Sequence, residues 1–206
     1  MIFGIPAVML LISVFIFRAN GIVSEQKHAE IVDQVEKTWG KKSKNVTPVS
    51  NEINVVSPIT GKLIKLRDVK DDTFSSGAVG QGFAIKPEDG RVLAPFDATV
   101  RRVFTTRHAV GLVGDNGVAL LIHIGIGTVK LKGTGFVSYV EQGQKVKKGD
   151  ELIEFWDPTI KKAGLDDIVI VVVTNSKDFE QFKLTADVGS EVKAEDQVMT
   201  LVAKKK

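Results

Sequence analysis

The chain has 206 residues, of which 43% are hydrophobic and 26% are charged, a balance that supports one ordinary folded domain with an appended segment. Basic residues exceed acidic ones only by 28 to 25. Because no basic stripe with interleaved aromatics occurs, we predict no nucleic-acid partner. Cysteine is absent, which excludes disulfide bridges, thiolate nucleophiles and cysteine-ligated zinc.

The first 17 residues, MIFGIPAVMLLISVFIF, carry no charge. Such a run is at the short limit for a helix that spans a bilayer, and it lacks the basic start and small-residue cleavage site of a signal peptide. We therefore predict a transmembrane helix over residues 1–20. The basic residues after the run favour a cytoplasmic location for the rest of the chain. They are Arg18, Lys27, Lys37, Lys41, Lys42 and Lys44.

Residues 21–40 are predicted to form a short amphipathic helix, because apolar residues recur there at helical spacing and Ser24 can cap its start. The apolar positions are Ile31, Val32, Val35 and Trp39. Residues 41–54 are polar, contain Gly, Ser, Asn and Pro, and have no apolar period, which predicts a linker.

Residues 55–206 are predicted to form an all-β domain, an antiparallel sandwich or barrel. Short β-branched runs alternate there with Gly, Pro and Asp. Two internal sequence repeats indicate that a turn-strand unit occurs twice. VSPI at 56–59 resembles LAPF at 93–96, and GxxVxxxDxL at 143–152 resembles GxxVxxxDxV at 189–198.

Of the three histidines, His28, His108 and His123, the last two flank a predicted β-hairpin. Asp115 and Asn116 can form its two-residue turn, because both residue types tolerate positive φ. Counting back from that turn pairs His108 directly with His123, on one face and within contact distance. A slip of one residue would put the two side chains on opposite faces.

Three chemistries suit such a pair, because imidazole titrates near neutrality. A nucleophilic triad lacks the GxSxG motif, although Thr105 and Thr106 are close. A catalytic zinc ion requires three protein ligands, whereas this pair provides only two histidines. A phosphoryl relay needs no metal, because one imidazole accepts the phosphoryl group while the other binds its oxygens.

Six segments carry a resemblance to a known family: VVSPITGKL, GFAIKP, VLAPFDATV, TTRHAVGL, LLIHIGIGTVKLKGTGF and GQKVKKGDELIEF. In this order they resemble the glucose-type IIA domain of the bacterial sugar phosphotransferase system, over about residues 55–203. The resemblance implies an antiparallel β-sandwich and a phosphotransferase component without cofactor or resident metal. It implies that HPr phosphorylates His123, that His108 supports it, and that Thr106 hydrogen-bonds the pair.

Two positions depart from the family pattern, which has Asp where this chain has Gln81 and Gly127. The resemblance implies that those carboxylates flank the site and meet an arginine of the donor. Their loss predicts weaker donor docking more than altered chemistry, so slow or regulatory phosphorylation and an inert relic both stay open.

The N-terminal part resembles the last membrane helix and tail of glycoside cation symporters, through GIPAVMLLISVFIF and HAEIVDQVE. In lactose permeases of that family a IIA domain follows this tail. One helix cannot form a sugar pathway, so we predict a membrane-tethered domain at the cell membrane, with the IIA part in the cytoplasm. A IIB domain or a sugar permease is its expected partner.

Other functions stay open. In a regulatory binding module, the histidines would gate by charge a contact made through an apolar rim. That rim would comprise Phe83, Ile85, Val110 and Ile124. A lipoyl or biotinyl carrier is suggested by GxxVxxGD at 143–150, but the modified lysine at a hairpin tip is missing. Related zinc peptidases need H-x-H where this chain has HIG, whereas a zinc ion shared with a partner carboxylate remains open.

Overall fold

The computed structural model describes residues 52–204. The predicted transmembrane helix (1–20), the amphipathic helix (21–40) and most of the linker (41–54) lie outside these residues. Between residues 52 and 204, no helix has the length and apolarity that a membrane crossing requires.

Strand β1 (Glu52–Val56) begins three residues before the boundary predicted between linker and domain. Ile53 and Val55 alternate inward and are buried in the main core. This alternation is the physical reason that the last residues of the predicted linker belong to the sheet.

Strands dominate the described chain, as the sequence predicts. After β1 they are β2 (Gly61–Lys65), β3 (Gln81–Pro87), β4 (Arg91–Leu93), β5 (Ala98–Val103), β6 (Ala109–Gly114), β7 (Ala119–Ile126), β8 (Phe136–Ser138), β9 (Lys145–Val146), β10 (Glu151–Phe155), β11 (Asp166–Val173), β12 (Phe179–Leu184), β13 (Glu191–Val192) and β14 (Gln197–Ala203). The short helices are η1 (Leu66–Asp68), α3 (Asp72–Ser75), η2 (Thr128–Leu131), α4 (Asp157–Lys162) and η3 (Ser176–Asp178).

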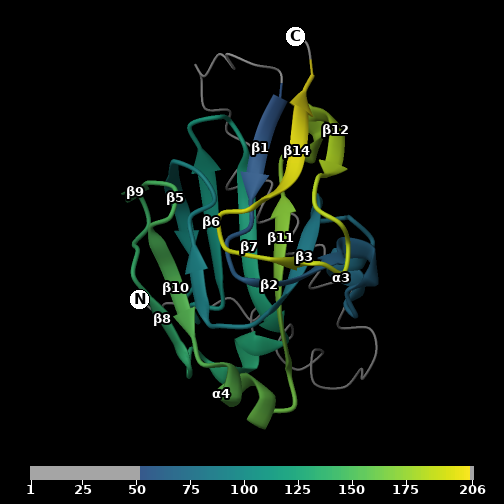
Figure 1. The fold of residues 1–206 in the computed structure, drawn as a ribbon. Helices are drawn as coiled ribbons and strands as arrows, with labels where there is room; N and C mark the ends of the chain where they lie inside the picture. Colours follow the sequence, from purple (N-terminus) through teal and green to yellow (C-terminus); the bar gives the residue numbers. More distant parts are fainter. Residues whose placement is uncertain (1–51, 205–206) are drawn as a thin grey trace, which may run out of the picture.

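The described strands form three sheets in which all strand pairs are antiparallel. The largest has the order β13-β2-β3-β11-β7-β6-β5-β9, and the two smaller ones are β1-β14-β12 and β4-β10-β8. Strands β7 and β11 run through the centre of the molecule, while β1, β14 and β12 lie together at one end (Figure 1). The predicted all-β antiparallel fold is thereby confirmed.

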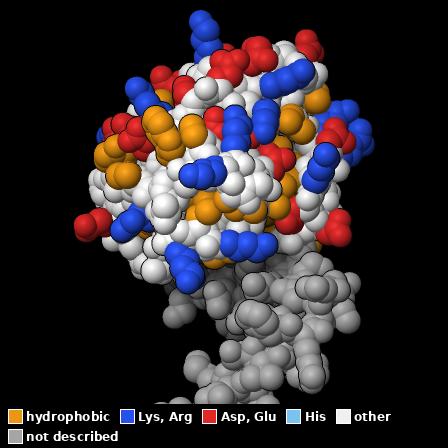
Figure 2. All heavy atoms as spheres, turned by 90° about the horizontal axis from the view of Figure 1, so that it is seen from below, with side chains coloured by type: hydrophobic (Ala, Val, Ile, Leu, Met, Phe, Trp, Pro, Cys, Tyr) orange, Lys and Arg blue, Asp and Glu red, His pale blue; other side chains and the backbone are white. Residues whose placement is uncertain are grey.

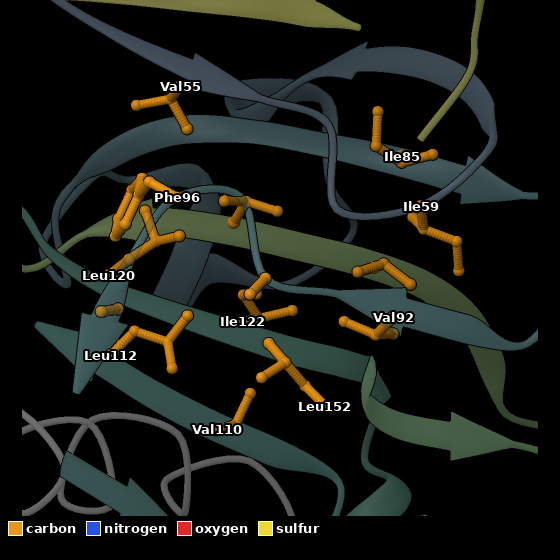
Figure 3. Packing of buried hydrophobic residues seen from close by; sticks show 14 of the residues in the cluster. Val55, Ile59, Ile85, Val92, Phe96, Val110, Leu112, Leu120, Ile122 and Leu152 are labelled. Carbon is orange, nitrogen blue, oxygen red and sulfur yellow. The ribbon is translucent and has the colours of Figure 1, made fainter. Parts of the chain in front are cut away.

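Strand β11 shows how the sequence builds two apolar layers. Its residues 168–173 are all Ile or Val, and alternate side chains point to opposite faces of the sheet. Val169 and Val171 join the main core, whereas Ile168 and Ile170 join a second cluster on the outer face. Figure 3 shows part of the main core, with Ile122 of the neighbouring strand β7 among its labelled residues. Each such buried side chain contributes about 1.5–3 kcal/mol.

The second cluster is covered by the segment that contains η1 and α3. This segment contributes Leu66, Val69, Phe74 and Val79 to the cluster. The outer face of the large sheet is therefore apolar and closed where this segment lies.

The two predicted turn-strand units have matching hydrogen bonds. Lys147 N donates to Asp150 Oδ2 at 2.7 Å, and Lys193 N donates to Asp196 Oδ2 at 2.8 Å. The strands at the start of the units also occupy equivalent places, since β9 pairs with β5 and β13 pairs with β2. The repeated sequence pattern thus corresponds to a repeated structure.

A buried ion-pair cluster ties α4 and β3 to β11. The Asp167 side chain is only 1% exposed and contacts Lys86 of β3 and, at 3.4 Å, Lys161 of α4. Burial raises the pKa of Asp167, but the hydrogen bonds and positive charges of the two lysines outweigh it, so the pKa lies below its ordinary value. A buried carboxylate in such a cluster stays ionised and needs its lysine partners.

Candidate functional site: a histidine pair beside the second cluster

The β6–β7 hairpin has a three-residue loop in place of the predicted two-residue turn. Gly114 N donates to Val118 O at 2.9 Å, and Gly117 N donates to Gly114 O at 2.9 Å. Gly117 has φ +83°, the left-handed conformation that follows a type I turn in three-residue hairpin loops. The prediction that Asp115 and Asn116 alone make the turn is therefore wrong.

The longer loop shifts the strand register by one residue. Ala109, not His108, pairs with His123, and Ile124 N donates to His108 O at 2.8 Å. The predicted direct pairing of the two histidines is thus wrong, because the hairpin loop holds one residue more than the prediction assumed.

The two imidazole rings nevertheless meet, with centroids 4.9 Å apart and ring planes at 84°. His108 does not belong to β6, which begins at Ala109. It is the last residue of the loop from Phe104 to His108 that joins β5 to β6, where Phe104 N donates to Ala109 O at 3.1 Å. A loop residue is not bound to the strict alternation of strand side chains, so the expected separation after a one-residue slip does not occur.

His123 projects from the centre of the large sheet. On the neighbouring strands it pairs with Ala109 of β6 and Ile170 of β11. Both belong to the second cluster, and directly paired residues share a face. The Phe74 ring of α3 lies 5.0 Å from the His123 ring. The histidine pair therefore lies among apolar residues on the outer face of the large sheet.

A second aromatic ring borders His108. The Phe104 ring packs edge-on against it with centroids 5.6 Å apart, and the guanidinium carbon of Arg102 lies 4.9 Å from the centre of the Phe104 ring. Neither Phe74 nor Phe104 is among the site residues predicted from the sequence. Phe74 reaches His123 only through the tertiary fold, whereas Phe104 is a local neighbour of His108 in the connection between β5 and β6.

Both imidazoles are neutral at pH 7. His108 is 6% exposed, and burial lowers its pKa to about 4. Burial, and then the neighbouring His108, lower the pKa of His123 to about 3, against a smaller raising effect of the Gly125 backbone. A neutral imidazole has one nitrogen with a free lone pair, which is the form a nucleophile requires.

The ring nitrogens have different surroundings. The Thr106 hydroxyl and His108 Nδ1 are 2.6 Å apart, so a hydrogen bond with Thr106 holds the His108 ring in place. His123 Nδ1 is buried and makes no hydrogen bond of good geometry. Of the two ring nitrogens of His123, only Nδ1 is a buried atom without a hydrogen-bond partner.

The two positions that depart from the family pattern carry no carboxylate beside the site. Gln81 is exposed at the start of β3, and its amide nitrogen is 3.1 Å from the place of a Cβ on Gly77, just after α3. Gly127 has φ +73°, and a Cβ there would be 4.0 Å from Lys130 Nζ. An aspartate at 127 would face a cation, in a backbone conformation that Asp tolerates.

The prediction of an exposed apolar rim for a docking module is wrong. Phe83, Ile85, Val110 and Ile124 are all 0% exposed and belong to the main core. The physical reason is strand alternation, which turns Ile124 to the face opposite His123. The exposed surface seen in Figure 2 mixes Lys and Arg with Asp and Glu, and apolar side chains lie between them.

Within the described part of the chain, no three His, Cys, Asp or Glu side chains are arranged to hold a metal ion. His108 and His123 could contribute to a metal site only if a partner supplied the further ligands that zinc requires.

Comparison with known proteins identifies the family and the fold. Residues 53–179 match the family model of the phosphoenolpyruvate-dependent sugar phosphotransferase system, EIIA 1. The fold is similar to that of glucose permease IIA from Mycoplasma capricolum, with a TM-score of 0.64 and 34% identity over 72% of this chain and 95% of that chain.

Among curated proteins, the chain is 58% identical over 98% of its length to a raffinose carrier protein of Pediococcus pentosaceus. It is 47% identical over 98% of its length to a lactose permease of Lactobacillus delbrueckii subsp. bulgaricus. It spans only 32% of each of these relatives. A β-glucoside-specific EIIBCA component of Bacillus subtilis is 44% identical over 68% of the chain and 23% of that protein.

The antiparallel β-fold and these relatives define the class, a domain of the bacterial machinery for sugar uptake and phosphorylation. The chain belongs to the EIIA 1 family of the phosphoenolpyruvate-dependent sugar phosphotransferase system, the glucose type that its sequence motifs resemble.

Proposed function

We propose that this domain is a phosphocarrier in which His123 accepts a phosphoryl group from HPr and passes it to a IIB partner, or uses it to regulate a sugar permease. The observation that carries the proposal is the contact of two neutral imidazoles, with ring centroids 4.9 Å apart, one of which, His108, is held by Thr106. Phosphoryl transfer depends mainly on such positioning and charge stabilisation.

In the proposed step, the lone pair of His123 Nε2 attacks phosphorus as the bond from phosphorus to the donor histidine breaks. The donor imidazole leaves with that electron pair. The proton on His123 Nδ1 stays in place, next to the backbone of Gly125 that already raises the His123 pKa. No oxidant, metal ion or water is consumed.

His108 supports the transferred group. When the Thr106 hydroxyl donates to His108 Nδ1, the proton of the neutral His108 ring is on Nε2, which can then donate to a phosphate oxygen. This gives Thr106 the role of holding the tautomer, and His108 the role of a hydrogen-bond donor rather than a nucleophile.

The test is incubation of the full chain with phosphoenolpyruvate, enzyme I and HPr. We expect an acid-labile phosphate on His123 that is lost in His123→Ala and kept in the control His28→Gln. His108→Gln should still accept phosphate but pass it on more slowly. Absence of phosphohistidine in the wild-type chain would contradict the phosphocarrier function.

The second candidate, regulation of a permease with little phosphotransfer, is favoured by the missing carboxylates at Gln81 and Gly127. Acidic rim residues would steer a donor by charge. Adding both carboxylates, as Gln81→Asp with Gly127→Asp, should raise the rate of phosphorylation by HPr and make it more sensitive to salt. An unchanged rate would show that these positions do not limit donor docking.

We also propose that the protein is held at the cell membrane through residues 1–17, with the IIA domain in the cytoplasm. The permease and carrier names of two relatives that match nearly the whole chain support this location. Membrane fractionation, with deletion of residues 1–20 as the comparison, tests it: a full chain that remains in the supernatant would contradict the anchor.

A further inference from the structure

The loop between β5 and β6 contains a backbone conformation that few side chains adopt. Arg107 has φ +54°, and its N donates to Phe104 O at 2.7 Å, which closes the turn. Positive φ is uncommon for any residue except glycine and is tolerated next best by Asn and Asp. Non-glycine residues in this conformation are held by their surroundings and concentrate at functional sites.

This turn holds both His108 and its hydrogen-bond partner Thr106. Thr106 directly precedes Arg107, and His108 directly follows it. The hydroxyl of the first reaches Nδ1 of the second at 2.6 Å, across the residue with positive φ. Strand pairing cannot produce the ring contact, because the ladder pairs His123 with Ala109. The shape of the loop must therefore bring His108 to His123.

We propose that Arg107 is a positioning residue whose left-handed backbone closes the loop that holds His108 against His123 and Thr106 against His108. The inference rests on the proposed phosphocarrier function for its consequence in transfer. It goes further by assigning the position of the supporting His108 ring to the backbone conformation of the preceding residue, Arg107.

The side chain of Arg107 offers a competing explanation. It is exposed, and a Cβ on Gly133 would lie 3.7 Å from Thr106 Cα and 3.8 Å from Arg107 Nη1, so its charge lies beside the loop and could attract phosphate. The experiment must separate the effect of backbone conformation from the effect of charge.

A series of Arg107 variants makes this separation in the full chain. Arg107→Gly and Arg107→Asn remove the charge but accept positive φ, whereas Arg107→Ala opposes positive φ moderately and Arg107→Val strongly. Arg107→Lys is the conservative variant, because it keeps the charge. Glu195→Val is the matched control, since Glu195 also has positive φ, at +72°, in the turn between β13 and β14.

The first readout is transfer. Phosphate uptake from HPr is compared with onward transfer to the IIB domain of the Bacillus subtilis β-glucoside-specific component. We expect Arg107→Val to slow onward transfer on the order of tenfold, as a displaced positioning group does, with a much smaller change in uptake. Gly, Asn and Lys at this position should transfer like the wild type, Ala should be intermediate, and Glu195→Val should transfer normally.

The second readout does not need phosphorylation. Nitrogen NMR of the imidazoles reports the hydrogen bond at His108 Nδ1, and nuclear Overhauser contacts report the proximity of the two rings. Arg107→Val should lose both signals and Arg107→Gly should keep them. If the wild type took up no phosphate, the phosphocarrier function would fail while the NMR comparison still decided the positioning role.

Two results would overturn the inference. One is a folded Arg107→Val, or Arg107→Ala if the valine variant does not fold, with the ring contact and transfer rates of the wild type. The other is equal slowing in Arg107→Gly, Arg107→Asn and Arg107→Val with full recovery in Arg107→Lys, which would assign the effect to charge.

Discussion

Acidification from pH 7 to pH 5 should leave the histidine pair uncharged. With a pKa of about 4 for His108 and about 3 for His123, about 90% of the first and about 99% of the second would be neutral at pH 5. Imidazoles with the ordinary pKa of about 6.5 would be only about 3% neutral there. Uptake of phosphate by His123 should therefore change less than about twofold through its own ionisation, where an ordinary histidine would lose roughly 25-fold.

The same shifts predict acid sensitivity of the fold. Because the folded pKa of each group lies below its unfolded value, the unfolded chain binds more protons once the pH drops below about 6.5. The contribution to stability is complete above that pH and is lost as the pH falls towards the folded values of about 4 and 3. For His108, 6% exposed, the loss at pH 5 is about 2 kcal/mol, and His123 adds to it.

Histidine-labelled protein titrated by nitrogen NMR measures both values, with His28→Gln to remove the third signal and His108→Gln to assign the other two. Urea unfolding at pH 7, 6 and 5 measures the loss of stability, and circular dichroism confirms that the chain is folded at each pH. A midpoint between pH 6 and 7 for either member of the pair, in folded protein, would refute the reasoning. The burial by Phe74 and Phe104 would then not exclude water from the rings.

Three further changes test the scaffold. Phe83→Ala removes a fully buried ring and should lower the free energy of unfolding by about 3–5 kcal/mol, measured in urea; a loss under about 1 kcal/mol would mean that the core refills the space. Gly82→Ala places a Cβ 1.9 Å from Val171 O, so it should break the pairing of β3 with β11 and lower the melting temperature, and an unchanged melting curve would contradict this close approach. Lys86→Met leaves the 1% exposed Asp167 carboxylate with only Lys161 and should lower the free energy of unfolding by about 1–3 kcal/mol at pH 7. Because the pKa of Asp167 is lowered in the fold, this deficit should shrink in acid as the carboxylate is protonated; a deficit independent of pH would point to packing.

The sequence was sufficient for features that depend on local periodicity. Continuous β-branched residues in 168–173 predict a buried strand, and the structure buries both faces of β11. The repeated GxxV and Asp positions predict the duplicated turns, because a glycine and a short acidic side chain are what such turns need. The family motifs then add the order of the segments and with it the class of domain.

The sequence does not determine the register of the hairpin, because Asp115, Asn116 and Gly117 suit both a two-residue and a three-residue loop. Gly117 was the available signal for the longer one, because its left-handed conformation ends such loops. His108 still contacts His123, because the loop between β5 and β6, and not strand pairing, brings the two rings together.

Tertiary relations explain the remaining differences. Phe74 arrives from a covering segment, and nothing in its local sequence links it to His123. The expected apolar rim is absent because its four residues lie in the main core; Ile124, next to His123, points to the opposite face of the sheet. Asp167 resembles a surface residue in sequence, and only the convergence of Lys86 and Lys161 makes its burial possible.

The pairing of β1 with β14 has an architectural consequence. Glu52 lies opposite Val202, so the described chain enters and leaves the fold on adjacent strands at the same end of one small sheet. Such a body can be spliced onto a neighbour, or set between two, without cutting a hydrogen-bonded ladder. The domain can therefore be fused to other proteins or inserted into them. Fusion to an unrelated protein should preserve its sheets.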